Sequence, residues 1–154
     1  MTHDEFRQQY EAYPWDPYQP LAVILSTGQR VYIDMPEQVQ LTADELVITR
    51  RTSPRKPERY RYADIARLVP LMELPADPGG MSYAEFDPLI RQLILQEPFR
   101  PYVVELRSGE RIEVTRPAPR AGRFMKVWEP SRLLRSIEFH DIARIVVPAE
   151  LASA

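Results

Sequence analysis

The residues that could act as acids, bases or metal ligands include one repeated pair of aspartates. An Asp-Ile-Ala-Arg tetrad at residues 64–67 returns unchanged at residues 141–144. A repeated carboxylate could bind a metal or transfer a proton, but an aspartate that enters a final strand commonly caps a turn. The arginine of each tetrad could pair with a carboxylate. We therefore expect structural roles for the four repeated charged residues, Asp64, Arg67, Asp141 and Arg144.

The remaining polar residues do not assemble a catalytic set. His140 precedes Asp141, but Ser131 and Ser136 lie in nothing that resembles a nucleophile elbow. A second histidine, His3, is unrepeated, and two distant histidines with scattered carboxylates are too few for a metal site. The chain has no cysteine, which excludes disulfides, thiolate catalysis and sulfur-ligated metals. We expect no catalytic residue, no metal, no cofactor and no enzymatic activity.

Positive charge is concentrated in two segments. Residues 50–61 contain one acidic residue, Glu58, and residues 116–135 contain only Glu129. Such segments either bind nucleic acid, here with Trp128 available to stack on a base, or are solvated loops, which is the commoner case. The candidate anion-binding or RNA-binding residues are Arg50, Arg51, Arg55, Lys56, Arg59, Arg61, Arg116, Arg120, Arg123, Lys126, Arg132 and Arg135.

Aromatic residues cluster near the N-terminus, at Tyr10, Tyr13, Trp15 and Tyr18. They could form a protein-binding platform, because aromatic residues dominate binding hot spots. The alternative is that they pack a helix onto a sheet. Trp15 is the best candidate for exposure, since the second half of the chain has Gln96 at the aligned position. The candidate interaction residues are Trp15, Tyr18 and Trp128.

These candidates lie on a chain that repeats itself. Residues 16–31 return as residues 97–112 at an offset of 81 (109 − 28 for the turn glycines), and the tetrads are offset by 77 (141 − 64). A repeat of this length predicts two copies of one structural unit. We expect a first helix-plus-barrel repeat at 1–74, a linker at 75–80 and a second repeat at 81–154.

Composition is ordinary for a globular protein. The chain has 154 residues, of which 44% are hydrophobic, and its net charge is −2. This balance lowers the expectation of nucleic-acid binding, which requires phosphate neutralisation. The acidic N-terminus has no apolar signal region, and the run at residues 21–25 is too short to span a bilayer. We expect a cytoplasmic protein that does not bind membranes.

Local patterns predict a short helix at the start of each repeat. A hydroxyl residue followed three places later by glutamate, at 2–5 and again at 82–85, is typical of a helix N-terminus. Pro14 should end the first helix. Pro88 would fall inside the second, so we expect that helix to begin later, with Asp87 as the N-cap and Pro88 as the first helical residue.

The rest of each repeat has the alternation of short antiparallel strands. Hairpins are expected around Gly28 and Gly109, at turns that favour positive φ. About five short strands must hide their edges, and a small closed barrel does so. We therefore expect a mainly β fold with short helices, namely two tandem small antiparallel β-barrels, each preceded by a short helix. The further strands are expected at 39–41, 46–48, 65–69, 124–128 and 142–147.

This order resembles the Sm-like fold, especially the bacterial Sm-like RNA chaperones. The resemblance covers residues 101–114, residues 139–148, which run through His140 into Val-Val-Pro, and residues 62–70 in the first repeat. It implies RNA binding and ring assembly through the edges of the last strands. The family's motif histidine falls on Asp64 and Asp141, however, and a carboxylate repels phosphate. The Pro-Phe-Arg-Pro opening also resembles a group of small bacterial proteins, and this likeness implies no activity.

Two functions remain in competition at this stage. A non-enzymatic protein-interaction or scaffold module fits the duplication, the balanced charge and the aromatic residues. Its partner would be another protein or a second copy of the chain that joins through barrel edge strands. The alternative is an Sm-like RNA-binding protein that uses the basic segments 50–61 and 116–135.

Overall fold

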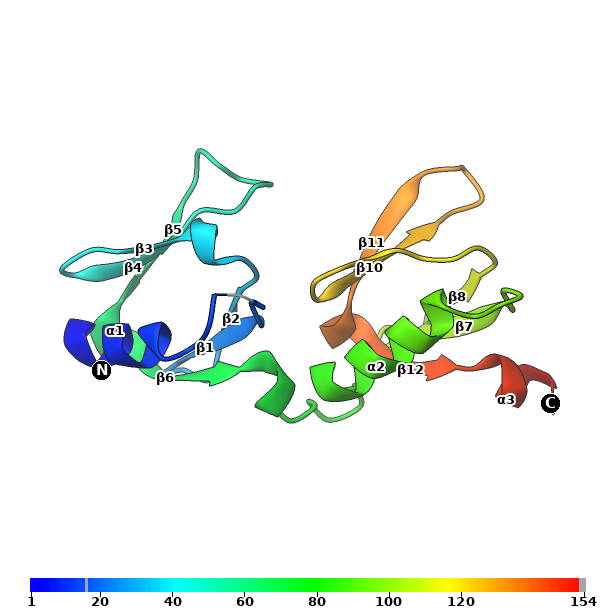
Figure 1. The fold of residues 1–154 in the computed structure, drawn as a ribbon, viewed down its shortest axis with the longest axis horizontal. Coiled ribbons are helices and arrows are strands. Elements are labelled where there is room, and N and C mark those ends of the chain that lie inside the picture. The colour runs from blue at the N-terminus through cyan, green and yellow to red at the C-terminus, as the bar shows by residue number, and fades with distance from the viewer. Residues whose placement is uncertain (16, 153–154) are drawn as a thin grey trace. The chain divides into compact units, whose positions relative to one another are not determined.

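The computed structural model describes residues 1–15 and 17–152, and the fold is mainly β with short helices, as expected (Figure 1). The chain divides into two compact units, Met1–Glu73 and Leu74–Ala154. The expected repeats fall one in each unit, except that Leu74 belongs to the second. Residues 16, 153 and 154 of the expected repeats lie outside the described residues.

Unit 1 consists of a helix and two three-stranded antiparallel sheets. The strand orders are β2-β1-β6 and β3-β4-β5. Its elements are α1 His3–Glu11, β1 Leu21–Leu25, β2 Arg30–Ile33, η1 Pro36–Gln38, β3 Val39–Leu41, β4 Glu45–Ile48, β5 Glu58–Arg61, η2 Tyr62–Asp64, β6 Ile65–Pro70 and η3 Leu71–Glu73, where η marks a 3₁₀ helix.

Unit 2 repeats this plan with the strand orders β12-β7-β8 and β11-β10-β9. All of these pairs are antiparallel. Its elements are α2 Tyr83–Ile94, β7 Tyr102–Leu106, β8 Arg111–Val114, β9 Arg120–Ala121, β10 Phe124–Trp128, β11 Leu134–Glu138, η4 Phe139–Asp141, β12 Ile142–Val146 and α3 Pro148–Ala152.

Helices α1 and α2 each dock on the 3₁₀ turn that precedes the last strand of their own unit. In unit 1 the Phe6 ring centroid lies 5.7 Å from that of Tyr62, and in unit 2 Phe86 lies 6.1 Å from Phe139. All four rings are buried. Aromatic pairs at this separation add to the free energy of burial, so the same contact positions both helices.

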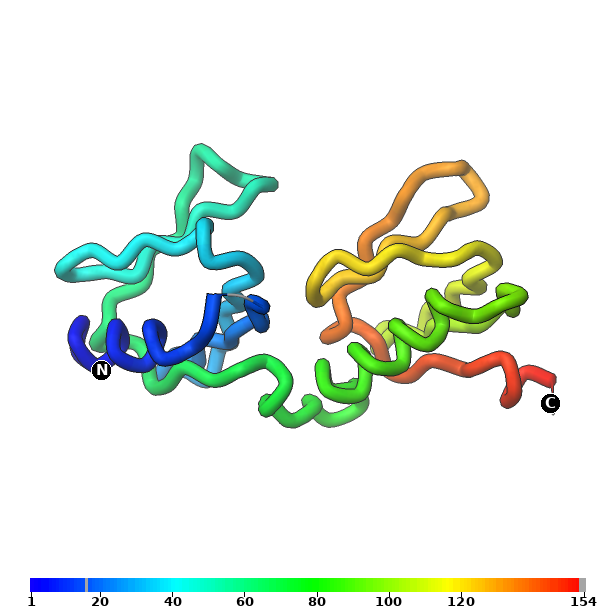
Figure 2. The backbone as a smooth tube through the Cα atoms, viewed as in Figure 1, coloured from blue at the N-terminus to red at the C-terminus, as the bar shows by residue number. Residues whose placement is uncertain are grey.

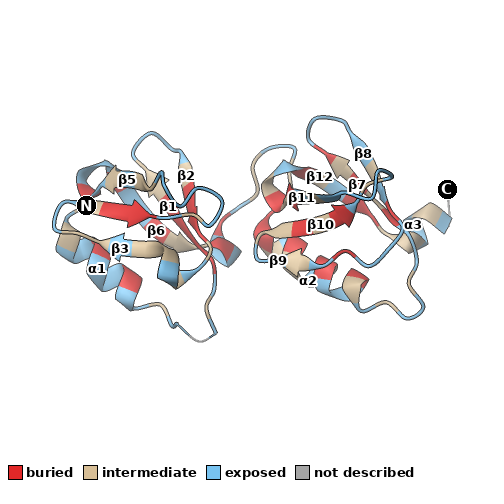
Figure 3. Ribbon diagram, turned by 90° about the horizontal axis from the view of Figure 1, so that it is seen from above, coloured by how far each residue is buried: buried red, intermediate tan, exposed pale blue. Residues whose placement is uncertain are grey.

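Both sheets of unit 1 contribute to one hydrophobic core. Figure 3 shows buried residues on the strands and on one face of α1. The strands contribute apolar side chains at alternating positions, such as Val31 and Ile33 in β2, as a half-buried sheet requires. The cluster contains Phe6, Tyr10, Leu21, Val23, Val31, Ile33, Leu46, Ile48, Tyr62, Ile65 and Leu68.

The predicted start of the second helix was wrong. Helix α2 begins at Tyr83, with Ser82 as the N-cap and a complete capping box with Glu85. Pro88 therefore lies inside the helix, where it leaves the Ala84 carbonyl without its usual N–H donor. The capping box and the buried stripe that follows it outweigh that loss.

The expected hairpins are present, β1 with β2 and β7 with β8. Their glycines have the expected positive φ, 89° at Gly28 and 94° at Gly109. Strands β5, β9 and β11 were not expected, because β5 and β11 are mostly polar and β9 has only two residues. The described pairs form two three-stranded sheets in each unit, and closure into a barrel stays a prediction.

The units differ most in one connection. Residues 49–57 join β4 to β5, whereas the shorter segment 129–133 joins β10 to β11, and the backbone trace in Figure 2 shows both loops. Within the described residues, no helix has the length and apolar character needed to cross a membrane.

Candidate functional site

Half of the candidate cations in the basic segment of unit 1 pair with carboxylates. Arg50, whose side chain is 16% exposed, lies with Nε 2.8 Å from Glu58 Oε2 and Nη1 3.3 Å from Asp34 Oδ2. Glu58 also accepts a hydrogen bond from the Tyr60 hydroxyl at 2.7 Å. Burial, assisted by this hydrogen bond, raises the pKa of Tyr60 to about 12. These contacts give Arg50 a structural role.

Other candidate cations are paired in the same way. The pairs join Arg51 to Glu37 at 3.4 Å, Arg59 to Glu45 at 3.4 Å, Arg123 to Glu138 at 2.6 Å and Arg135 to Glu110 at 2.6 Å, and Arg120 contacts Asp87. Among residues 1–15 and 17–152, no ion pair is found for the remaining candidates, which are Arg55, Lys56, Arg61, Arg116, Lys126 and Arg132. Ion pairing thus neutralises much of the charge that the sequence concentrates.

The repeated aspartates connect the last strand to the first hairpin through their backbones. The Asp64 carbonyl accepts the Ser26 N–H at 2.8 Å, and the Asp141 carbonyl accepts the Arg107 N–H at 2.8 Å. Each aspartate ends a 3₁₀ helix, and each residue is exposed. The structure therefore gives this pair equivalent backbone contacts in the two units. Arg144 pairs with Glu105, whereas no ion pair is found for Arg67 in the described parts of the chain.

His140 pairs with Asp77 and not with its neighbour Asp141. Its Nε2 lies 3.4 Å from Asp77 Oδ2 and 3.2 Å from Arg107 Nη1. Arg107 in turn lies 3.6 Å from Asp77. This triplet ties the segment before α2 to η4 within unit 2. Nowhere in the described residues do three or more His, Cys, Asp or Glu side chains gather as a metal site would require.

The two aromatic candidates in unit 1 differ in exposure. Trp15 is 62% exposed. Tyr18 packs against the core, and its hydroxyl donates a hydrogen bond to the Ile33 carbonyl at 3.0 Å. Burial is the main reason that the pKa of Tyr18 is raised. Trp15 therefore remains the accessible member of this cluster.

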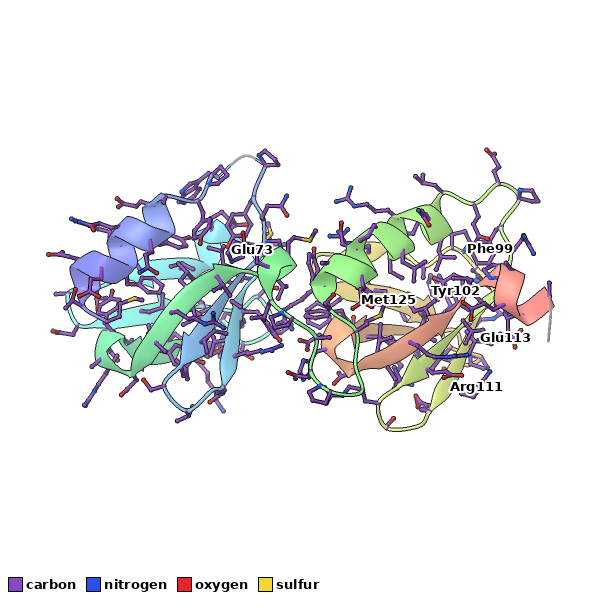
Figure 4. All side chains as sticks on the ribbon, turned by 90° about the horizontal axis from the view of Figure 1, so that it is seen from below. Glu73, Phe99, Tyr102, Arg111, Glu113 and Met125 are labelled. Carbon is purple, nitrogen blue, oxygen red and sulfur yellow. The ribbon has the colours of Figure 1, made fainter. Side chains whose placement is uncertain are left out.

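Three candidates of the second basic segment line a cleft in unit 2, namely Arg116, Arg132 and Arg135, whereas Arg120, Arg123 and Lys126 do not. Strand β8 forms one wall, and Figure 4 marks Arg111 and Glu113 on it. The connection between β10 and β11 forms the other wall, with Trp128, Arg132 and Arg135 among the lining residues. The Arg116 guanidinium lies 5.8 Å from the Trp128 ring centroid, which is a cation–π distance.

Large apolar side chains are exposed beside this cleft. Trp128 and Leu134 are directly opposite each other in the β10–β11 pair, and each is 45% exposed. Leu133, in the turn, is 66% exposed. We name these three residues, Trp128, Leu133 and Leu134, the apolar hairpin tip. Clustered apolar exposure of this kind marks interaction surfaces more often than single exposed side chains do.

Unit 1 has different residues at the corresponding place. The last inward-facing core residues of the two hairpins are Ile48 in β4 and Val127 in β10. The next position is therefore Thr49 in unit 1 and Trp128 in unit 2. The tryptophan side of the cleft is thus specific to unit 2.

Trp128 and three arginines of this site were predicted from the sequence, whereas Arg111 and the two leucines were not. Leu133 and Leu134 are adjacent in sequence, so no alternation marks them as surface residues. Their position opposite Trp128 depends on the register of a strand that was not expected. Comparisons with protein-family models, with curated proteins and with solved structures give no match to the chain.

Proposed function

We propose that this protein is a non-enzymatic interaction module whose binding surface is the apolar hairpin tip with the adjoining cleft of unit 2. The observation that carries the proposal is the exposed Trp128–Leu134 pair beside the Leu133 side chain. Binding hot spots are enriched in tryptophan and arginine, and both line this cleft. The partner is therefore expected to contribute an apolar side chain that covers the indole of Trp128.

The duplicated architecture supports a scaffold role. The repeat and the two three-stranded sheets in each unit support a tandem of small barrels with an Sm-like layout, in which the chain crosses between sheets at η1 and η2. We include self-association through exposed edge strands as part of this proposal. The absence of cysteine supports a reducing compartment such as the cytoplasm.

The proposal is tested by selecting peptides from a random display library against the whole chain. Trp128→Ala is used as the counter-selection, and Trp15→Ala, in unit 1, is the matched control. We expect the enriched peptides to bind the parent chain and the W15A variant with equal affinity. Their affinity for W128A should be at least about thirtyfold lower, because that variant lacks a hot-spot residue. Enrichment of peptides that bind W128A equally well would contradict the proposal.

RNA binding is the second candidate. It is favoured by the Arg116–Trp128 contact, which resembles a stacking platform, and by the candidate cations for which no ion pair is found. If it holds, affinity for single-stranded RNA falls steeply with salt, because binding releases counterions. Alanine at Arg55 and Lys56 should then make the slope shallower. Absence of binding at low salt would exclude this candidate.

A further inference from the structure

Three hairpin turns of this protein share one hydrogen-bond pattern. They span residues 25–29, 106–110 and 129–133. In each, the first residue donates its N–H to the carbonyl of the fifth, and the fourth donates its N–H to the carbonyl of the first. All six donor–acceptor distances are 2.8 or 2.9 Å. This is the pattern of a type I turn followed by a left-handed residue.

The fourth residue has positive φ in every case, but its identity changes. Gly28 and Gly109 have φ of 89° and 94°, whereas the third turn has Arg132 with φ of 67°. It is the one non-glycine residue with positive φ among residues 1–15 and 17–152. A β-carbon is disfavoured in that conformation, so glycine would suit the turn better. The arginine side chain is retained at a cost to folding.

The surroundings of Arg132 indicate what its side chain could do. Arg132 lines the cleft with Arg116 and Trp128. Among the described residues no ion pair is found for either arginine, whereas the other two cleft arginines are neutralised, Arg111 by Glu105 and Arg135 by Glu110. The Arg116 guanidinium thus lies by the exposed indole, and Arg132 lines the same cleft. Guanidinium groups bind carboxylates through paired, charge-assisted hydrogen bonds.

The charges of the cleft select among anions. Three carboxylates also line it, those of Glu110, Glu113 and Glu129. A nucleic acid would bring successive phosphates close to these groups, and like charges repel. A single carboxylate next to an apolar side chain brings only one negative charge into the cleft, so it meets less of this repulsion than a run of phosphates does. A protein segment of that kind therefore fits the cleft better than RNA does.

We propose that Arg132, together with Arg116, binds a carboxylate of an acidic partner segment whose neighbouring apolar side chain covers Trp128. This inference rests on the proposed interaction function and adds the chemical class of the partner. It also explains why this turn has an arginine at the left-handed position, where the two equivalent turns have glycine. Hydrogen bonds to charged groups of this kind change affinity by about tenfold to a hundredfold.

The test uses the peptides selected above as probes. A synthetic version of the enriched peptide is compared with one in which each Asp or Glu is replaced by Asn or Gln. We expect an acidic residue beside an apolar one in the selected peptides. Arg132→Gly and Arg132→Ala should each weaken binding by about tenfold to a hundredfold. Arg67→Ala, a substitution of an exposed arginine in unit 1, is the matched control and should leave affinity unchanged.

The glycine variant separates binding from folding. R132G relieves the left-handed backbone, so its thermal midpoint should equal or exceed that of the parent chain while its affinity falls. The selection could also yield peptides that require Trp128 for binding but contain no acidic residue and bind R132G with normal affinity. That result would overturn this inference and leave the proposed function intact. A selection without Trp128-dependent peptides overturns both. Binding of single-stranded RNA that requires Arg132 would replace the acidic partner with a nucleic acid.

Discussion

Arg144 of β12 lies opposite Glu105 of β7, with its Nε 3.1 Å from Glu105 Oε2. The same tetrad position in unit 1 is Arg67, and its opposite residue in β1 is Ile24. The repeated arginine therefore has a cross-strand carboxylate in one unit and an aliphatic side chain in the other. Divergence of the facing strand, and not of the tetrad, explains why only one expected ion pair formed there.

Replacing Arg144 with alanine should lower the free energy of unfolding by less than about 1 kcal/mol, since its side chain is 60% exposed and exposed pairs contribute little. The effect should vanish in high salt. Arg67→Ala is the control and should have no salt-dependent effect. Urea unfolding at two salt concentrations measures both, and an equal salt-dependent loss for R67A would contradict the assignment.

Tyr102→Phe should raise the free energy of unfolding by about 1 kcal/mol. The Tyr102 ring is fully buried, and its hydroxyl has no hydrogen-bond partner among the described residues. A buried polar group without a partner retains its desolvation cost. Tyr18→Phe is the opposite case and should lower the free energy of unfolding by about 1 kcal/mol, because it removes the hydrogen bond to the Ile33 carbonyl. Denaturant titration compares the two, and destabilisation by Y102F would show that the hydroxyl is satisfied.

Stability should fall at alkaline pH as tyrosines ionise. Burial raises the pKa of Tyr102 to about 12, from an ordinary value of 10.0. A raised pKa in the folded state means that the contribution to stability is complete below pH 10 and is lost as pH rises from 10 towards 12. The free energy of unfolding, measured across this interval, should decline less steeply for Tyr102→Phe. An unchanged slope would show that Tyr102 does not contribute.

Pro88→Ala should stabilise unit 2. The substitution restores an N–H donor to the Ala84 carbonyl inside α2, and an interior proline costs up to about 3 kcal/mol relative to alanine. Pro148→Ala is the control, because Pro148 is the first residue of α3, where proline is tolerated. Thermal unfolding followed by circular dichroism should show a higher midpoint for P88A alone. A lower midpoint would mean that Pro88 packing outweighs the missing hydrogen bond.

The parts of the fold that depend on local chemistry were predictable. The hairpins follow from glycines that must adopt positive φ, and the first helix follows from its N-cap. Strand β5 was not predictable, because only Tyr60 in its sequence marks an inward face. That strand forms because Leu46 and the rest of β4 offer backbone partners in register. Pairing across a sheet is non-local, so single-sequence patterns do not contain it.

In the candidate site, too, residue types were predictable from the sequence and non-local contacts were not. Trp128 and the arginines of segment 116–135 were recognised by residue type. Their ion pairs were not, because Arg135 and its partner Glu110 are brought together only when β8 and β11 form their sheets. Leu134 gained its place opposite Trp128 in the same way. Residue type thus indicated the chemistry, and tertiary pairing decided which of the charges stayed free.

The shorter β10–β11 connection has a consequence for engineering and for evolution. The β4–β5 and β10–β11 loops are flanked by equivalent strand pairs, in which Ile48 lies opposite Glu58 in unit 1 and Val127 lies opposite Arg135 in unit 2. Residues 128–134 could therefore be transplanted onto β4 and β5 without altering a core side chain. A duplicated scaffold of this kind allows one copy to acquire a new specificity through a single interchangeable loop while the other keeps its original surface.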